Sequence, residues 1–443
     1  MHHDRFGQPI TAQSARAVEL YDDAVDRMFA LQPGSDALVD GALALDPEFA
    51  LGHCAKARTL AGLGDNAGAR DSAARGRDLA AHCSERERRH AEIVYRVLRG
   101  DSGSALDAVR AHAVDHPRDA VPISFALGVY GLYGFGGFKD FRSRQVELLK
   151  RLAPAWGNDD WWFLASYGWA LVEAGDAETG IPMLDRALEL KPDNANAAHG
   201  RTHGYYEQGA AEEGEEFIEA WLPRYDRGAI LHAHLAWHQA LFALQRGDAE
   251  RAHAIYLDSI RPAVSRTLPM FTLVDCASFL LRAEVVGTVA DPAQRRELVD
   301  LVEERFAKPG IPFVNAHIVM AYGGVSDRES QDRIQREVAK LLERDRQPCG
   351  PVVADVCSAV AAYSKGDYRH AADTLARALP EVERLGGSNA QRDVFIDLAV
   401  SAHIRCGAMN AARNLASERW TRRAGHLDET WFDRLCAVQN QRP

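Results

Sequence analysis

The stretch Trp161–Pro192, WWFLASYGWALVEAGDAETGIPMLDRALELKP, decides the fold. In its first half, apolar and small side chains from Leu164 to Leu171 recur at spacings of three and four, which places them on one face of a helix. Gly175 can end that helix in a left-handed conformation, and Asp176 can cap a following helix. The second half has the same periodicity. The stretch therefore predicts two helices joined by a tight turn.

This pattern recurs along the chain. A Gly-Asp pair separates an apolar helical segment from an Ala-rich one at Gly64-Asp65, Gly100-Asp101, Gly175-Asp176, Gly247-Asp248 and Gly366-Asp367. The first two pairs are 36 residues apart, a period typical of helical repeats. Alternating strand patterns between turn signals are nearly absent. We therefore expect an all-α fold, a right-handed α-solenoid of antiparallel helix pairs.

The repeating unit resembles the tetratricopeptide repeat, which has the same order of small and large packing positions and a late proline. On this basis we expect four segments: a helical cap (1–35), tetratricopeptide-like repeats with a His-rich groove (36–260), irregular helical pairs (261–350), and C-terminal repeats with capping helices (351–443). The stretch Tyr130–Phe138 contains four glycines and is expected to be a loop.

Composition excludes several classes of protein. The 443 residues are 47% hydrophobic and 26% charged, which is too apolar for a disordered chain. The formal net charge of −11 and the lack of a basic patch argue against a nucleic-acid partner. No apolar run suits a membrane span or a signal peptide, and the seven scattered cysteines form no CxxC pair. We therefore expect a cytoplasmic protein that does not enter a membrane.

Four histidines form the most informative pattern. His199 and His203, and likewise His234 and His238, are four residues apart, so the two rings of each pair project from one helix face. The two pairs are separated by 35 residues, one repeat, and should occupy equivalent positions on neighbouring helices. All four imidazoles are therefore expected to face one hollow.

Three interpretations of this patch stay open. The histidines could be ordinary hydrogen-bonded groove residues, they could act as acid, base or anion-binding groups in a small-molecule pocket, or they could bind Zn²⁺ or another divalent metal. Glu173 or Glu207 could supply an oxygen ligand. The HExxH motif of metalloproteases is absent, because Gly200 follows His199 and Leu235 follows His234.

Further residues are predicted to line the ligand site. They are aromatic, charged or amide side chains that lie in the same repeats, on one later helix face or at the start of a late helix: Trp162, Trp169, Glu173, Tyr206, Trp237, Asp275, Arg282, Gln391, Arg392 and Asp393. Arg392 could bind a carboxylate or phosphate in bidentate fashion. Alternatively, Ser388 caps a helix and Arg392 and Asp393 form a solvated pair, or Asp275 and Arg282 form a buried pair.

The order of six segments resembles the tetratricopeptide repeat protein 38 family over nearly the whole chain. These segments are DPEF (46–49), SERER (84–88), HPRD (116–119), HGRTHGYYEQGAAEEG (199–214), HLAWHQALF (234–242) and GGSNAQRDVF (386–395). The sequence departs from the family at Tyr206, where an acidic residue is typical, and at Asn389, where a histidine is typical. The resemblance implies a fold and no settled activity.

The sequence thus predicts a groove protein that binds a small anionic ligand, with acid/base catalysis by the histidines left open. A scaffold that binds an extended peptide is the alternative, and a His-coordinated metal site is another. No cofactor is obligatory in this interpretation. The sequence leaves open whether the protein is an enzyme and whether it forms oligomers.

Overall fold

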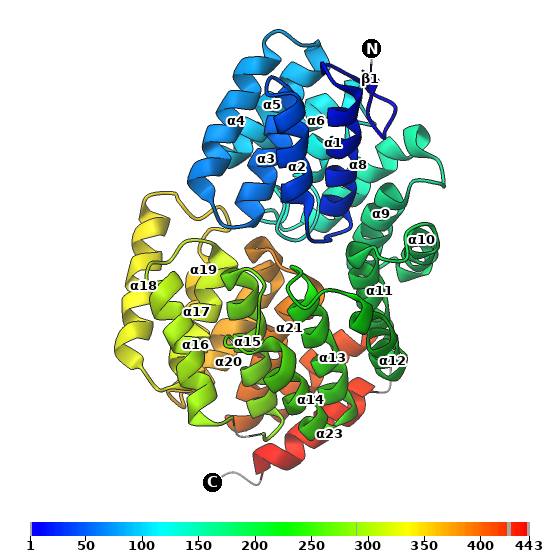
Figure 1. The fold of residues 1–443 in the computed structure, drawn as a ribbon. Helices are drawn as coiled ribbons and strands as arrows, with labels where there is room; N and C mark the ends of the chain where they lie inside the picture. The colour runs from blue at the N-terminus through cyan, green and yellow to red at the C-terminus, as the bar shows by residue number, and fades with distance from the viewer. Residues whose placement is uncertain (1, 289, 423–426, 441–443) are drawn as a thin grey trace. The chain divides into compact units, whose positions relative to one another are not determined.

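The computed structural model describes residues 2–288, 290–422 and 427–440. Contacts divide the chain into two compact units. Unit 1 comprises the residues up to Gly136, Arg142–Ala170 and Pro182–Ala198, and unit 2 comprises Gly137–Phe141, Leu171–Ile181 and the chain from His199 onward. The boundary between the units thus falls within three consecutive helices, which are labelled α9, α10 and α11 in Figure 1.

The first part of the chain is helical apart from one short hairpin. Its elements are β1 (His2–His3), β2 (Pro9–Ile10), α1 (Ala15–Phe29), α2 (Ser35–Leu45), α3 (Ala50–Gly62), α4 (Asn66–Ala80), α5 (Glu85–Leu98), α6 (Ser102–Asp115), α7 (Ala120–Ser124) and α8 (Phe141–Trp156). The helices that cross the unit boundary are α9 (Trp161–Glu173), α10 (Ala177–Leu190) and α11 (Ala195–Gln208).

The rest of the chain is helical as well. Its elements are α12 (Ala211–Trp221), η1 (Leu222–Arg224), α13 (His232–Arg246), α14 (Ala249–Ile255), η2 (Tyr256–Ile260), α15 (Pro269–Val285), α16 (Pro292–Arg305), α17 (Pro312–Gly324), α18 (Arg328–Glu343), α19 (Val352–Ser364), α20 (Tyr368–Ala378), η3 (Leu379–Leu385), α21 (Asn389–Arg405), α22 (Met409–Arg422) and α23 (Leu427–Asn440).

The Gly-Asp pairs join the helices as the sequence predicts. Gly175, between α9 and α10, has a φ of +96°, a conformation that only glycine adopts without a Cβ penalty. Asp176 then caps α10, because its Oδ1 accepts a hydrogen bond from Thr179 N at 3.1 Å. Gly247 and Asp248 join α13 to α14 in the same way. These turns reverse the chain and make successive helices antiparallel.

Within unit 2, two kinds of helix alternate. The odd-numbered helices α13, α15, α17 and α19 contact one another in series, and α13 is buried on every side from His232 to Leu244. The even-numbered α16 and α18 bury one face only, through residues such as Leu298 and Ile334, and expose the other. The inner helices thus form the core of the unit.

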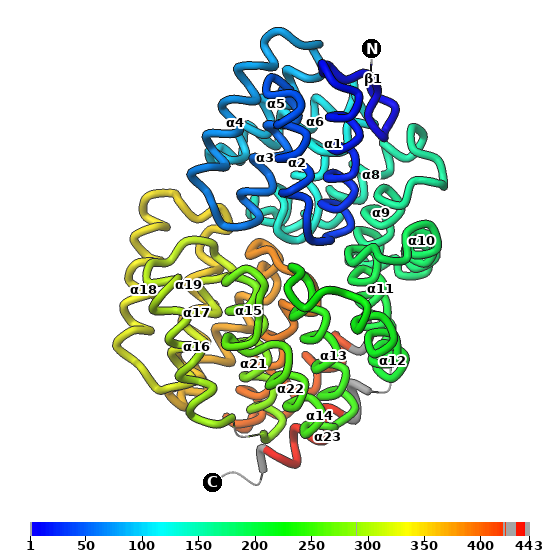
Figure 2. Tube along the Cα trace, in the orientation of Figure 1, coloured from blue at the N-terminus to red at the C-terminus, as the bar shows by residue number. Residues whose placement is uncertain are grey.

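Helix α21 lies against this inner row. It contacts α15 and α19 and is buried from Asn389 to Ile404 with the exception of Ile396 (Figure 2). The inner face of these helices is therefore covered by a helix of the same chain.

The structure confirms the predicted fold class, an all-α fold of antiparallel helix pairs of the tetratricopeptide type. The glycine-rich Tyr130–Phe138 is a non-helical connection, as expected, because glycine destabilises helices. Consecutive helices from α15 to α18 contact each other within 261–350, and the four-segment division stays a prediction. Among the described residues, no helix is both long and apolar enough to cross a bilayer. All seven cysteines are free thiols.

Candidate functional site

Two helices of unit 2 supply the four histidines. His199 and His203 lie on consecutive turns of α11, and His234 and His238 lie on consecutive turns of α13. All four side chains are buried, with exposed fractions of 5%, 0%, 4% and 0% in chain order. The structure therefore brings together all four rings that the one-repeat spacing placed at equivalent positions.

The four imidazoles converge on one point. Each offers one nitrogen such that the four nitrogens lie within 4.8 Å of one another. The Nε2 atom of His199 is 2.9 Å from His203 Nε2 and 3.1 Å from His234 Nε2. The ring of His238 lies 4.6 Å from that of His203 and 4.9 Å from that of His234, centroid to centroid. We call these four residues the histidine cluster.

Two buried carboxylates lie behind the histidine cluster. Glu173, the last residue of α9, has its Oε1 2.8 Å from His203 Nδ1. Asp275, on α15, has its two oxygens 3.0 and 2.9 Å from His234 Nδ1. Each carboxylate lies within hydrogen-bonding distance of one Nδ1, and an Nδ1–H that donates to it leaves the lone pair of Nε2 directed into the cluster. Metal-binding histidines are oriented by carboxylates in this way.

The short contacts among three Nε2 atoms of the cluster need more protons than neutral imidazoles supply. If Nδ1 carries the proton in both His203 and His234, their Nε2 atoms are acceptors, and both face His199 Nε2. One nitrogen can donate a hydrogen bond to only one of them. The three nitrogens therefore require either an additional proton or a cation between them.

Burial favours the neutral form of two of the imidazoles. Burial, together with the neighbouring histidines, holds the pKa of His199 and of His238 well below the ordinary value. Burial by itself raises the pKa of Glu173, but His203, Arg392 and the Asn389 N–H together lower it to about 2. For Asp275, burial raises the pKa more than His234 and Arg282 lower it. A neutral imidazole is the form that binds a metal ion.

His238 is the member of the cluster whose two ring nitrogens lack hydrogen bonds within the described part of the chain. Its Nδ1 and Nε2 are both buried and neither has a hydrogen-bond partner among the described residues. A buried polar atom without a partner costs about 1–3 kcal/mol. Such an atom in a native protein needs an explanation, and a bound ion is one of the few.

Aromatic side chains enclose the cluster. Trp237 is fully buried and stacks on the ring of His234 with a centroid distance of 5.2 Å. The ring of Tyr206 lies 6.4 Å from that of His238, and its hydroxyl donates to Asp393 Oδ2 at 3.0 Å. These rings exclude water from the nitrogens.

The start of α21 contacts the same carboxylate that orients His203. The backbone N–H of Asn389 donates to Glu173 Oε2 at 2.9 Å, and its side-chain amide donates to the Glu173 carbonyl at 3.1 Å. Arg392 donates to Asn389 Oδ1 at 2.8 Å and to the Gly387 carbonyl. Gln391 completes a capping box with Ser388. Arg392 and Asp393 are buried, so the solvated pair considered in the sequence analysis is wrong.

Arg282 and Asp275 do not pair directly. Arg282 on α15 donates from Nε to Asp397 Oδ2 at 2.8 Å and from Nη2 to the Ala390 carbonyl at 2.6 Å. Arg419 of α22 pairs with the other oxygen of Asp397. Asp397 therefore links α15, α21 and α22. No sequence signal pointed to Asp397, because it is 115 positions from Arg282.

Two predicted ligand-binding aromatics belong to unit 1. Trp162 is buried and stacks on Phe29 at 5.0 Å, with Trp156 also at 5.0 Å, so its contacts are those of a core residue. Trp169 lies next to Gly128 in the same unit. The ligand-binding role of both tryptophans stays a prediction, as does that of the other predicted site residues.

Comparison with known proteins finds only distant structural similarity. No family model matches the chain. A human IFIT1 dimer with PPP-AAAA is 13% identical, with a TM-score of 0.44, over 98% of this chain and 97% of that chain. Yeast Tom70 is 12% identical, with a TM-score of 0.34, over 97% of this chain and 90% of that chain. At such identity and TM-score the likeness carries no functional information.

Proposed function

We propose that the protein is a metal-binding protein and that the histidine cluster of unit 2 holds one divalent cation, Zn²⁺ in the first instance. The observation that carries the proposal is the convergence of four buried imidazole nitrogens within 4.8 Å. Nitrogen ligands suit Zn²⁺, which prefers four ligands in a tetrahedron with Zn–N distances of about 2.0–2.1 Å. Such a tetrahedron has an edge of about 3.3 Å. The distances of 2.9 and 3.1 Å between His199 Nε2 and its two neighbours are close to that edge.

The carboxylates behind the ligands support the same proposal. Glu173 and Asp275 each fix the ring orientation of one histidine and keep its Nε2 free of a proton. Four neutral imidazoles, one dication and two carboxylates carry no net charge. A buried cation is tolerated when its charge is balanced in this way.

The burial of all four ligands favours a structural role for the cation. Structural zinc sites fill every coordination position with protein atoms, whereas catalytic sites keep one position for water or substrate. Here four protein nitrogens would fill all four positions. The cation would fasten α11 to α13, and through Glu173 and Asp275 it would also hold the end of α9, the first half of α15 and the start of α21.

The alternatives from the sequence have less support at this site. An anionic ligand would meet the two carboxylates, Glu173 and Asp275, that already lie behind the cluster. An extended peptide would need an inner face that α21 covers. Acid/base catalysis by these histidines would need access for a substrate to rings that are at most 5% exposed.

We further infer membership of the tetratricopeptide repeat protein 38 family. Three of the six segments behind that resemblance supply this region: 199–214 contains His199 and His203, 234–242 contains His234 and His238, and 386–395 contains the start of α21. The resemblance is thus concentrated in the residues from which the metal site is proposed.

Metal analysis tests the proposal. Protein stripped with a chelator and then dialysed against Zn²⁺ should retain about one ion per chain by elemental analysis. Titration with Co²⁺ should produce the intense visible absorption of a tetrahedral complex. The variants His203→Ala and His238→Ala should lose both signals while circular dichroism shows the same helical content.

Two control variants separate this site from other histidines. His2→Ala/His3→Ala removes the adjacent pair at the N-terminus, and His82→Ala removes an exposed histidine. Both should bind metal like the wild type. If the wild type binds no more Zn²⁺ than His238→Ala, the cluster is a network of shared protons and the proposal fails.

A further inference from the structure

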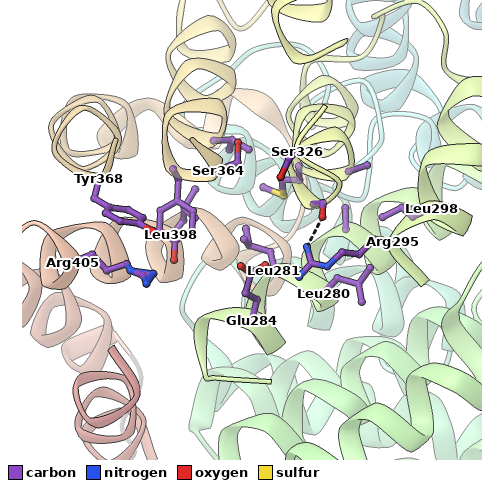
Figure 3. Close-up of a pocket in the computed structure, with 17 residues that line it drawn as sticks. Leu280, Leu281, Glu284, Arg295, Leu298, Ser326, Ser364, Tyr368, Leu398 and Arg405 are labelled. Carbon is purple, nitrogen blue, oxygen red and sulfur yellow. Dashed lines mark hydrogen bonds and ion pairs between the residues drawn. The ribbon is translucent and has the colours of Figure 1, made fainter. Parts of the chain in front are cut away.

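Unit 2 contains a cavity, separate from the histidine cluster, that the metal proposal does not use. Its volume is about 320 Å³, within the range of small-molecule sites. The wall is formed by side chains from α15, α16, α17, α19, α20 and α21 (Figure 3). None of the residues of the histidine cluster and neither of its two carboxylates lines it.

Five aliphatic residues line part of this cavity. Leu280, Leu281, Met320, Val360 and Leu398 line it, and most of these side chains are buried. Leu398 lies between the two ends of the cavity in Figure 3, which shows Arg405 at one end and Arg295 at the other. An apolar ligand body of moderate size would therefore be covered by aliphatic side chains along its length.

Arg295 and Arg405 differ in their ion pairs. Arg295 forms an ion pair with Glu284 at 2.7 Å and donates to the Gly324 carbonyl at 3.3 Å. Its charge is thus neutralised within the cavity. Arg405, the last residue of α21, stacks on the ring of Tyr368 with its Cζ 4.5 Å from the centroid. Among the described residues no carboxylate pairs with it.

Arg405 therefore gives one end of the cavity a net positive charge. Arg405 is half-buried and its guanidinium lies over the ring of Tyr368, so less side-chain entropy remains to be lost on binding. A planar guanidinium matches a carboxylate or sulfonate with two parallel hydrogen bonds. The other polar groups nearby are already engaged: Tyr363 Oη bonds Ser401 at 2.7 Å, and Ser364 bonds Gln331.

We propose that this cavity binds a small amphipathic anion, an organic carboxylate or sulfonate whose acidic group meets Arg405 and whose apolar body lies on Leu280, Met320 and Leu398. The site is separate from the histidine cluster and goes beyond the metal-binding function. Metal and anion should therefore bind independently.

A pair of fluorescent probes tests this directly. 1-Anilinonaphthalene-8-sulfonate has a sulfonate on an aromatic body, and N-phenyl-1-naphthylamine has the same body without the charge. The wild-type protein should bind the sulfonate saturably and with one site, and the neutral amine about tenfold more weakly or less, because the amine lacks the charge-assisted hydrogen bonds. Equal binding of the two probes would overturn the proposal.

Variants locate the site. Arg405→Ala should weaken binding of the sulfonate probe about tenfold or more, and Leu281→Trp should block binding by filling the cavity. Arg296→Ala, which removes an exposed arginine from α16, should bind like the wild type. Circular dichroism and thermal melting should match among the three. If Arg405→Ala, folded, binds the sulfonate like the wild type, the anion site is not here.

The His238→Ala variant separates this proposal from the first. It should bind the sulfonate probe unchanged, since no residue of the histidine cluster lines the cavity. A wild-type protein that binds no metal but binds the probe would disprove only the metal site, and a wild-type protein that binds metal but not the probe would disprove only the anion site.

Discussion

His199 Nε2 and His234 Nε2 lie 3.1 Å apart although the two residues are 35 positions apart in the sequence. That separation is one repeat, so the two rings occupy corresponding turns of α11 and α13. A repeat places equivalent residues at equivalent heights on neighbouring helices. One i,i+4 pair of histidines, repeated once, is therefore enough to build a four-nitrogen cluster.

The two carboxylates behind the cluster should tune the affinity for metal. Glu173→Gln and Asp275→Asn each keep the size of the side chain but remove the charge that orients a ligand ring. We expect each change to weaken Zn²⁺ binding about 10–100-fold, with the helical content unchanged. Competition with a chromogenic chelator measures this. Glu212→Gln, an exposed glutamate on α12, is the matched control and should have no effect. Wild-type affinity in both carboxylate variants would show that they do not act on the ligands.

Metal binding should stabilise the folded protein. A ligand that binds only the native state adds about 2.7 kcal/mol to the free energy of unfolding when its free concentration is 100 times its Kd. Zn²⁺ should therefore raise the melting temperature of the wild type, and a chelator should lower it again. His238→Ala should show neither change. A melting temperature of the wild type that is independent of Zn²⁺ would contradict the idea that the cation fastens α11 to α13.

The sequence predicted those features that depend on local spacing. The Gly-Asp turns, including Gly175-Asp176, follow from backbone preferences, and the i,i+4 and one-repeat spacings of the histidines follow from helix geometry. Both require only the residues of one or two neighbouring repeats. This is why the fold class and the gathering of the four rings could be derived without coordinates.

Features that depend on distant parts of the chain could not be derived. Asn389 meets Glu173 across 216 positions, and Tyr206 meets Asp393 across 187. No spacing rule relates such residues, since α21 packs against helices of other repeats. For the same reason a buried pair of Asp275 and Arg282, which share a helix face, was one alternative from the sequence, whereas in the structure they pair with His234 and Asp397.

Asp397 should be essential for stability because it pairs with two buried arginines. Its oxygens accept from Arg282 and Arg419, and Asp397→Ala would leave both guanidinium groups without that carboxylate. Removing one partner of a buried ion pair costs about 3–5 kcal/mol. Urea unfolding followed by circular dichroism measures the change. Asp300→Ala, which breaks an exposed pair with Arg296, should cost less than about 1 kcal/mol. Similar losses of unfolding free energy in both variants would show that the buried ion pairs of Asp397 stabilise the protein no more than an exposed pair does.

Gly387 should not tolerate a side chain. Its φ is +80°, and a Cβ there would lie 2.8 Å from two ring carbons of Phe313. Gly407 has a similar φ of +79° but open space around the Cβ position. Gly407→Ala should therefore cost only the backbone strain of about 1–2 kcal/mol. Gly387→Ala should cost about 1–3 kcal/mol more, because the contact with the ring adds to the strain. Equal costs in urea unfolding would show that Phe313 moves aside.

His317 on α17 should make the protein less stable in acid. It is fully buried with its Nδ1 2.8 Å from the Phe313 carbonyl, and burial lowers its pKa to about 4. The unfolded chain binds this proton near the ordinary pKa of 6.5, so the stabilisation is complete above that value and is lost as the pH falls from 6.5 towards 4. Between about pH 7.5 and about pH 4.5 the loss amounts to about 2.5 kcal/mol. His317→Asn keeps a donor for the carbonyl but does not titrate. Its free energy of unfolding should therefore fall less than that of the wild type over this interval, by about the same 2.5 kcal/mol. Parallel pH profiles for the two proteins would mean that His317 is protonated in the folded state as readily as in the unfolded chain.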